Sequence, residues 1–105
     1  MTHGFEREAL QEYLSTARYY GEQREGLGEE FVQAVVAAVA TIAAEPTRFQ
    51  SAGDGLRIFR MKRFPYYLFY RFDERSNHAT FFAVMHQRRR PDYWRHRLSG
   101  DEPSL

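Results

Sequence analysis

The chain has 105 residues and a net charge of +1, which suits one domain built around a single hydrophobic core. It has no cysteine, so a disulfide framework and a thiolate metal site are both excluded. The N-terminus lacks the apolar run of a signal peptide, and the longest weakly polar stretch, Phe31 to Ala44, has 14 residues, too few to cross a bilayer. We therefore expect a cytoplasmic protein with no membrane contact, folded over residues 1–98 and disordered over 99–105.

The small net charge conceals a division along the chain. Residues 1–56 carry −5, residues 57–97 carry +8, and residues 98–105 carry −2. Of the 15 cationic side chains all except Lys62 are arginines, whose planar guanidinium suits bidentate contacts to phosphate or carboxylate. This division predicts an anionic partner for the second half of the chain.

The first half of the chain predicts a short strand followed by two helices. Residues 2–6 favour the strand. Helical spacing begins at Glu8 and is interrupted by Gly21, and a second helix extends from about Glu29 to Glu45, where Pro46 ends it. The first helix has one apolar stripe: Leu10, Tyr13, Leu14, Ala17 and Tyr20. The second has a wide one, which predicts packing on more than one side: Phe31, Val35, Ala38, Val39 and Ile42, flanked by Val32, Val36, Ala40 and Ala43.

The second half changes to a period of two. After a loop at 50–55, strands are expected at 56–63, 66–73 and 79–86, joined by short connections into an antiparallel meander. The order strand, helix, helix and three strands predicts an α+β fold in which the helices cover one face of the sheet and leave the other partly open. Residues 91–97 favour a short terminal helix that starts at Pro91.

The candidate functional residues follow the last strand, because a strand that ends in cationic and aromatic residues presents them rigidly. His86 ends the strand, three arginines follow at 88–90, and Tyr93 and Trp94 come next. His86 could act as a base, having an ordinary pKa near ~6.5, or simply cap the strand through a backbone hydrogen bond. The four histidines (3, 78, 86, 96) lack metal-ligand spacing, and the Gly-Leu-Gly at 26–28 is too short for a phosphate loop, so we expect no metal and no cofactor.

Several stretches resemble the RelE/ParE superfamily of bacterial type II toxins. The first is Ala17-Arg-Tyr-Tyr20 with Gly26-Leu-Gly28 and Phe31. The second is Arg63-Phe-Pro-Tyr66 with Tyr70-Arg71, and the third is Ala83-Val-Met-His86 leading into Arg88-Arg-Arg-Pro91, Tyr93-Trp94 and Arg97. The resemblance implies a toxin that a cognate antitoxin holds inactive by wrapping a C-terminal segment around it, in a toxin–antitoxin hetero-oligomer.

The resemblance leaves two targets open, since ParE-like toxins poison DNA gyrase whereas RelE-like toxins cut mRNA on the ribosome. For an mRNA interferase it implies His86 as base, Arg88 as phosphate ligand and Tyr93 as proton donor or stacking aromatic. For target binding it implies a larger set: Arg60, Lys62, Arg63, Arg88, Arg89, Arg90 and Trp94.

The arginines at 88–90 are expected to contact nucleic acid or the antitoxin's carboxylates, unless they are simply solvated. No glutamate is expected near this site. Without a full acid–base set, the sequence favours the ParE-like inhibitor over the nuclease.

Overall fold

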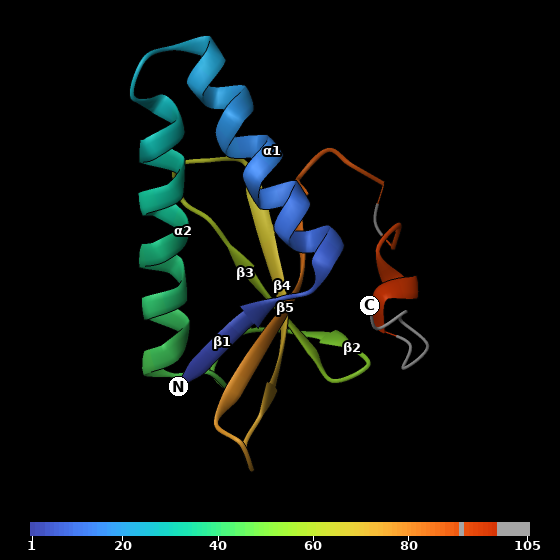
Figure 1. Cartoon of the computed structure of the whole chain (residues 1–105). Coiled ribbons are helices and arrows are strands. Elements are labelled where there is room, and N and C mark those ends of the chain that lie inside the picture. The colour runs from blue at the N-terminus through green and yellow to red at the C-terminus, as the bar shows by residue number, and fades with distance from the viewer. Residues whose placement is uncertain (91, 99–105) are drawn as a thin grey trace.

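A five-stranded sheet carries two helices on one face and the C-terminal segment on the other (Figure 1). The computed structural model describes residues 1–90 and 92–98. The elements in chain order are β1 (Thr2–Phe5), α1 (Arg7–Gln23), α2 (Leu27–Ala44), β2 (Ser51–Gly53), β3 (Leu56–Arg60), β4 (Tyr66–Asp73), β5 (His78–His86) and a 3-10 turn (Arg95–Leu98). The α+β class and the predicted order of helices and strands are confirmed.

The sheet has the order β1-β5-β4-β3-β2. Its central strands form the predicted antiparallel meander, but β1 pairs with β5 in parallel, so the sheet is mixed. The loop expected at 50–55 contains the additional strand β2, which turns into β3 through Asp54 and Gly55, both at positive φ. Positive φ at both turn residues is the geometry that an Asp-Gly pair favours in a two-residue hairpin.

Two further boundaries differ from the sequence prediction. β3 ends at Arg60 rather than residue 63, because the chain bends at Lys62 and Arg63 before Pro65. The described part of the predicted terminal helix is a turn at residues 92–94 followed by the 3-10 turn. Its expected start at Pro91 and the tail at 99–105 lie outside the described residues.

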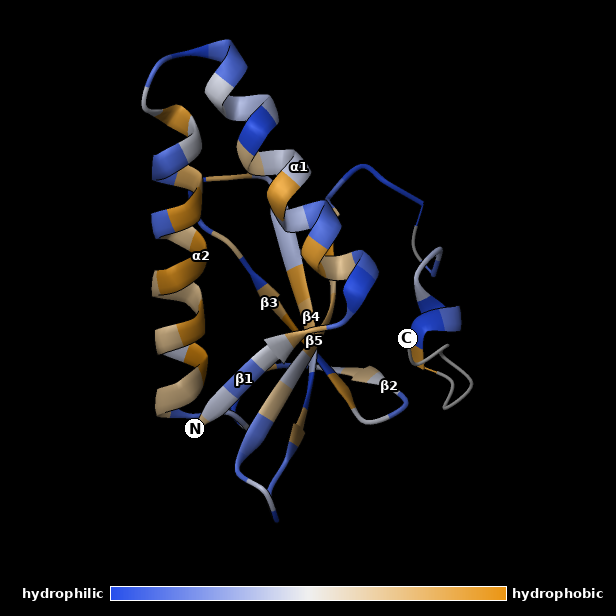
Figure 2. Ribbon diagram, viewed as in Figure 1, coloured by the Kyte–Doolittle hydropathy of each residue, from blue (hydrophilic) through white to orange (hydrophobic). Residues whose placement is uncertain are grey.

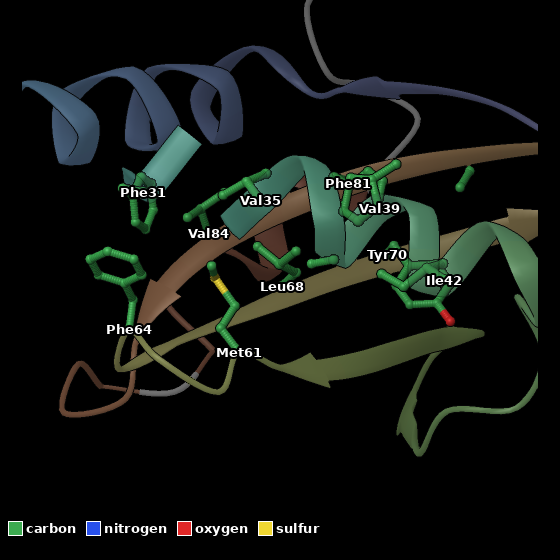
Figure 3. Close-up of a cluster of buried hydrophobic side chains, with 12 residues drawn as sticks. Phe31, Val35, Val39, Ile42, Met61, Phe64, Leu68, Tyr70, Phe81 and Val84 are labelled. Atoms are coloured by element: carbon green, nitrogen blue, oxygen red, sulfur yellow. The ribbon is translucent and has the colours of Figure 1, made fainter. Parts of the chain in front are cut away.

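The main core lies between the helices and the sheet (Figure 3). α2 buries the five residues of its predicted stripe, and Phe31 and Ile42 are completely inaccessible. Burial of each such side chain stabilises the fold by about 1.5–3 kcal/mol. The flanking row is not buried as expected: Val36 is 53% exposed, because no element covers that side of α2 among the described residues.

α1 contributes less to this core than its stripe suggests. Tyr13, Ala17 and Tyr20 pack against the core, whereas Leu10 and Leu14 are 41% and 52% exposed. The buried residue of α1 is Ala9, so the helix is rotated from the orientation that the stripe predicts.

α2 also corrects the expectation from the 14-residue apolar stretch. As an 18-residue helix it is long and apolar enough to span a bilayer by length and composition alone, the one such helix within the described ranges. Figure 2 shows its apolar character along nearly its whole length. Here, however, it packs on the sheet as the core helix.

α1 and α2 lie in close contact at Gly28. A Cβ atom there would lie 2.5 Å from the backbone oxygen of Ala17, a contact that forces one of the helices to move. We expect Gly28→Ala to lower the free energy of unfolding by about 1–3 kcal/mol in urea denaturation. Gly21→Ala is the matched control, because its Cβ would meet nothing within 4 Å and alanine favours helix by up to about 1 kcal/mol. Equal midpoints for the two variants would contradict close helix packing at Gly28.

Candidate functional site

The site begins with an irregularity in β5. Phe69 pairs with Ala83 and the next residue, Tyr70, pairs with Phe81, so Phe82 is an extra residue on β5. Such a β-bulge shifts the alternation of side chains by one position. Phe82 and Ala83 therefore both face away from the helices, whereas Val84 packs in the main core. The same shift carries His86, two residues further on, to the helix side.

β1 ends at Phe5, opposite Phe81, so the backbone groups that follow on this edge of β5 have no neighbouring strand, and side chains bind them. Glu12 of α1 accepts a hydrogen bond from the Val84 N–H through Oε1 at 3.0 Å. Arg97 donates from Nη1 to the Phe82 carbonyl at 3.0 Å. Two side chains from distant parts of the chain thus take the place of a neighbouring strand.

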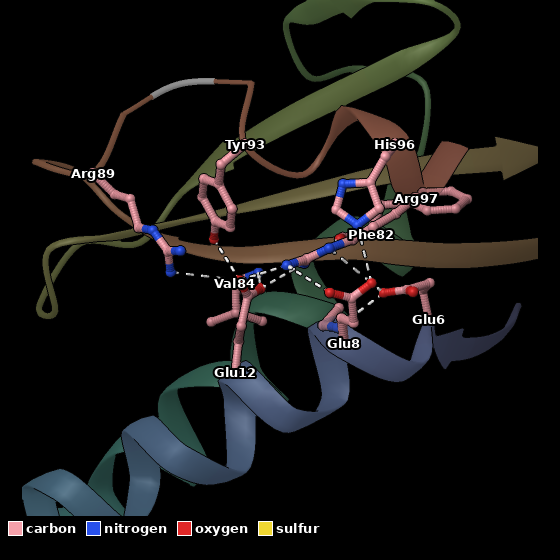
Figure 4. Close-up of polar contacts among 10 residues, drawn as sticks. Glu6, Glu8, Glu12, Phe82, Val84, Arg89, Tyr93, His96 and Arg97 are labelled. Carbon is pink, nitrogen blue, oxygen red and sulfur yellow. Dashed lines mark hydrogen bonds and ion pairs between the residues drawn. The ribbon is translucent and has the colours of Figure 1, made fainter. Parts of the chain in front are cut away.

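Glu12 and Arg97 bind each other at the same point (Figure 4). Nη1 of Arg97 donates to Oε1 of Glu12 at 2.9 Å, and Nη2 donates to Oε2 at 3.0 Å. The side chains of Arg97 and Glu12 are 5% and 16% exposed. Burial opposes the charge on Arg97, but the hydrogen bonds to Glu12 together with the charge interactions with Glu12, Tyr93 and Glu8 outweigh it and raise the pKa of the guanidinium. A bidentate pair of this kind fixes the geometry of both partners.

Tyr93 and Arg89 complete the cluster around Glu12. The Tyr93 hydroxyl donates to Oε2 of Glu12 at 2.5 Å, and burial together with this bond raises the pKa of the phenol well above its usual range. The Arg89 guanidinium lies 3.7 Å from the centre of the Tyr93 ring and 4.0 Å from Oε2 of Glu12. The sequence prediction that no glutamate lies near the site is therefore wrong.

His86 borders a groove of about 420 Å³ beside this cluster. The groove is lined by residues from α1, β4, β5 and the C-terminal segment: Glu8, Gln11, Glu12, Ser15, Thr16, Tyr66, Val84, His86, Arg89 and Arg97. Nδ1 of His86 lies 3.0 Å from the Arg88 amide nitrogen and accepts its hydrogen. This is the strand-capping role that the sequence analysis weighed against catalysis. With Nδ1 as acceptor, a neutral imidazole carries its proton on Nε2.

The predicted site residues do not form one surface. Arg88 and Arg90 are exposed on the turn after β5, while Trp94 is 2% exposed and packs on Phe69 with ring centres 4.6 Å apart. Burial leaves Trp94 with almost no surface for contacting a target. The C-terminal segment therefore covers part of the far face of the sheet, while Tyr67 and Arg60 on that face remain accessible.

The three remaining cationic residues of the predicted set lie on a different groove. Arg60, Lys62 and Arg63 line a space of about 560 Å³ between α2 and β3, which shares no lining residue with the groove at His86. Arg60 donates to the Tyr67 hydroxyl at 3.0 Å, and Arg63 pairs with Glu30. The pairing with Arg63 lowers the pKa of the Glu30 carboxyl.

The cluster can bind and orient, but its proton-transfer groups are occupied. General acid–base chemistry requires a donor and an acceptor that are free to exchange protons with a substrate. Here the Tyr93 hydroxyl donates its hydrogen bond to a carboxylate that also binds Arg97, and Nδ1 of His86 accepts a hydrogen bond from the backbone. Sequence reasoning missed Glu12 because it is a polar residue between apolar positions of α1. Its separation from Arg97, 85 residues, leaves no local signal.

Removing the charge of Glu12 tests the role of the buried pair. Glu12→Gln keeps the size of the side chain but replaces one acceptor oxygen by an NH2 donor and leaves Arg97 only the more distant carboxylates of Glu6 and Glu8, so we expect the free energy of unfolding to fall by about 2–4 kcal/mol. Glu8→Gln is the control, since Glu8 is 41% exposed and its loss should cost less than about 1 kcal/mol. Glu12→Gln combined with Arg97→Met should recover part of the loss. A Glu12→Gln protein as stable as Glu8→Gln in urea would contradict a structural role for the pair.

A family model described as the ParE toxin of the type II toxin–antitoxin system, parDE, matches residues 5–91. No curated protein is similar enough to the chain to count as a relative. The matched region contains both helices, the sheet from Phe5 onward and the arginine turn, so it includes most of the elements described above. The family implies an antitoxin as partner. The chain belongs to the ParE toxin family and is the toxin component of a type II toxin–antitoxin system.

Proposed function

We propose that this toxin inhibits growth by binding DNA gyrase in the cytoplasm, without cutting nucleic acid, and that its cognate antitoxin neutralises it. The observation that carries the proposal is the state of the two candidate proton-transfer groups. The Tyr93 hydroxyl and Nδ1 of His86 are both held in hydrogen bonds within the fold. A nuclease that uses the 2′-hydroxyl of RNA needs such groups free.

The arginine turn after β5 is the surface that supports binding to a macromolecular target. Arg88, Arg89 and Arg90 are all exposed, and the turn is tied to the segment before β4, because the Gln87 N–H donates to the Pro65 carbonyl at 2.9 Å. Arg89 also packs on Tyr93, so within this turn Arg88 and Arg90 are the two guanidinium groups to which the described residues offer no side-chain partner. Their charge favours an acidic protein surface or DNA bound to gyrase.

The first test separates the two activities in the family. Induction of the toxin alone should stop growth, raise the DNA-damage response and increase DNA cleavage by purified gyrase. Co-expression with the protein of the neighbouring small reading frame should restore growth if that protein is the antitoxin. Fragmentation of translated mRNA with unchanged gyrase cleavage would contradict the proposal and favour a ribosome-dependent interferase. Normal growth at good soluble expression would contradict toxicity itself.

The second test concerns the arginine turn. Arg88→Glu combined with Arg90→Glu should lower the affinity for gyrase at least about tenfold at low salt, because favourable charge contacts become repulsive. The same two residues changed to Gln should cost less. Arg75→Glu is the matched control, because this exposed residue lies in the turn at the other end of β5. Unchanged affinity in the Glu variant, with Arg75→Glu unchanged as well, would exclude the turn from the interface.

A further inference from the structure

The exposed large apolar side chains of the described residues all lie on the hairpin formed by α1 and α2. They are Leu10, Leu14 and Tyr19 on α1 and Val36 on α2. The two helices stand side by side on one face of the sheet (Figure 1), so the outer surface of the hairpin faces solvent. Apolar side chains that gather on such a surface mark an interaction site.

Leu10 and Leu14 lie on the flank of α1 that faces α2. They precede Ala17 by seven and three residues, so all three share one side of the helix. Ala17 is the point at which α1 touches α2, since a Cβ atom on Gly28 would lie 2.5 Å from its backbone oxygen. The two leucines therefore continue the line of contact between the helices outward into solvent.

The matching flank of α2 carries two valines. Val32 and Val36 follow Gly28 by four and eight residues, so they lie on the side of α2 that faces α1. Val32 is partly buried and Val36 is exposed. The four side chains of the two flanks form one apolar surface, here called the hairpin patch: Leu10, Leu14, Val32 and Val36.

Each flank ends in an unpaired charge, and the two charges have opposite signs. Arg18 follows Leu14 by four residues on α1, and Glu29 precedes Val32 by three residues on α2. Both side chains are exposed, and neither makes an ion pair or a side-chain hydrogen bond within the described part of the chain. Towards the connection between the helices, the flank of α1 thus ends in a positive charge and the flank of α2 in a negative one.

From these features we infer that the hairpin patch binds a second copy of the chain, with the two-fold axis parallel to the helices. α1 of each copy then lies on α2 of the other, as in a four-helix bundle. The leucines pack against Val32 and Val36 of the partner subunit, and Arg18 pairs with Glu29 of the partner subunit. Two-fold symmetry makes each of these contacts twice. The inference does not rest on the proposed function.

The charges also select this arrangement over the pairing of α1 with itself. The exposed flank of α1 reads Arg7, Leu10, Leu14 and Arg18, with a positive charge at each end. An antiparallel contact between two copies of α1 would bring Arg7 against Arg18 of the partner subunit at both ends. Like charges in contact oppose association. Packing of α1 on α2 of the second copy replaces this repulsion by attraction.

The size of the surface sets the strength expected of the dimer. α1 and α2 have 17 and 18 residues. At about 1.5 Å per residue and about 10 Å per helix diameter, they form a face of roughly 500 Å². Specific interfaces of standard size bury about 800 Å² per partner, so this face suits a reversible dimer with a dissociation constant on the order of 10 μM.

The test is sedimentation equilibrium of the full-length toxin at concentrations from about 1 to 300 μM, a range that brackets the expected dissociation constant. Leu14→Glu should raise the dissociation constant at least about tenfold, because it places an unpaired charge inside the apolar contact. Tyr19→Glu is the matched control, since Tyr19 is also an exposed apolar residue of α1 but lies outside the hairpin patch. It should leave the dissociation constant within about twofold.

An exchange of charges tests the orientation of the two copies. Arg18→Glu and Glu29→Arg should each raise the dissociation constant at least about fivefold, because each brings like charges together twice. The double variant restores both ion pairs with their signs reversed and should return the constant to within about twofold of the original. A folding defect in one single variant would not be repaired by the other substitution.

A monomer throughout the concentration range would overturn the inference, as would a dimer that Leu14→Glu leaves unchanged or a double variant that stays as weak as the single ones. None of these readouts uses gyrase. If the toxin is monomeric and Leu14→Glu abolishes its effect on gyrase cleavage, the hairpin patch belongs to that target. Self-association is then refuted while the proposed function stands. A dimer without any effect on gyrase gives the reverse result.

Discussion

The fold depends on the contact between Glu12 and Arg97, because this pair closes the sheet where its backbone pairing stops. β1 is short and ends at Phe5, while β5 continues to His86. A partly buried backbone N–H or C=O group of β5 without a hydrogen-bond partner lowers the stability of the fold by about as much as the loss of a hydrogen bond. Glu12 and Arg97 bind those groups and neutralise each other. The charged pair thus makes the hydrogen bonds to β5 that a neighbouring strand would otherwise make. Such a pair tolerates loss of one member poorly, since the other is then left as a buried charge.

The same pair determines the position of the C-terminal segment. Arg97 fixes one end of it to α1, and Arg95 fixes it to the β2–β3 hairpin through Asp54 and the Ala52 carbonyl. Trp94, which precedes Arg95, packs against Phe69 and forms with Met85 part of a second core on the far face of the sheet. Aromatic and cationic residues that read as a binding platform are therefore largely structural. Trp94 stabilises the fold by burial, and Tyr93 stabilises it through its bond to Glu12.

Local sequence patterns predicted the helices and the main strands well. They could not predict the interactions between residues that are distant in the sequence. The buried stripe of α2 and the three meander strands follow from periodicity, which each segment carries within itself. β2 was detectable in principle, since Asp54-Gly55 is a strong hairpin signal when it stands between strands. The bulge at Phe82 was not, because its effect is to break the period on which the prediction relied. Without that shift, His86 would face the other side of the sheet. The role of Glu12 was not predicted for a related reason. A polar residue on an amphipathic helix is expected to face solvent unless the fold supplies a cationic partner.

The charge division along the sequence takes on a different meaning in the folded chain. Much of the negative half meets the positive half internally, through Glu12 with Arg97, Glu8 with His96, Glu30 with Arg63 and Asp54 with Arg95. Among the cationic side chains without an acidic partner in the described residues, Arg88 and Arg90 lie on the turn after β5, and Arg60 and Lys62 lie beside the groove at β3. An anionic partner gains most where positive charge has not already been neutralised within the fold. The two surfaces involve different residues, but both adjoin the connection between β3 and β4, because the Gln87 N–H donates to the Pro65 carbonyl. A macromolecule bound at one of them therefore lies near the other.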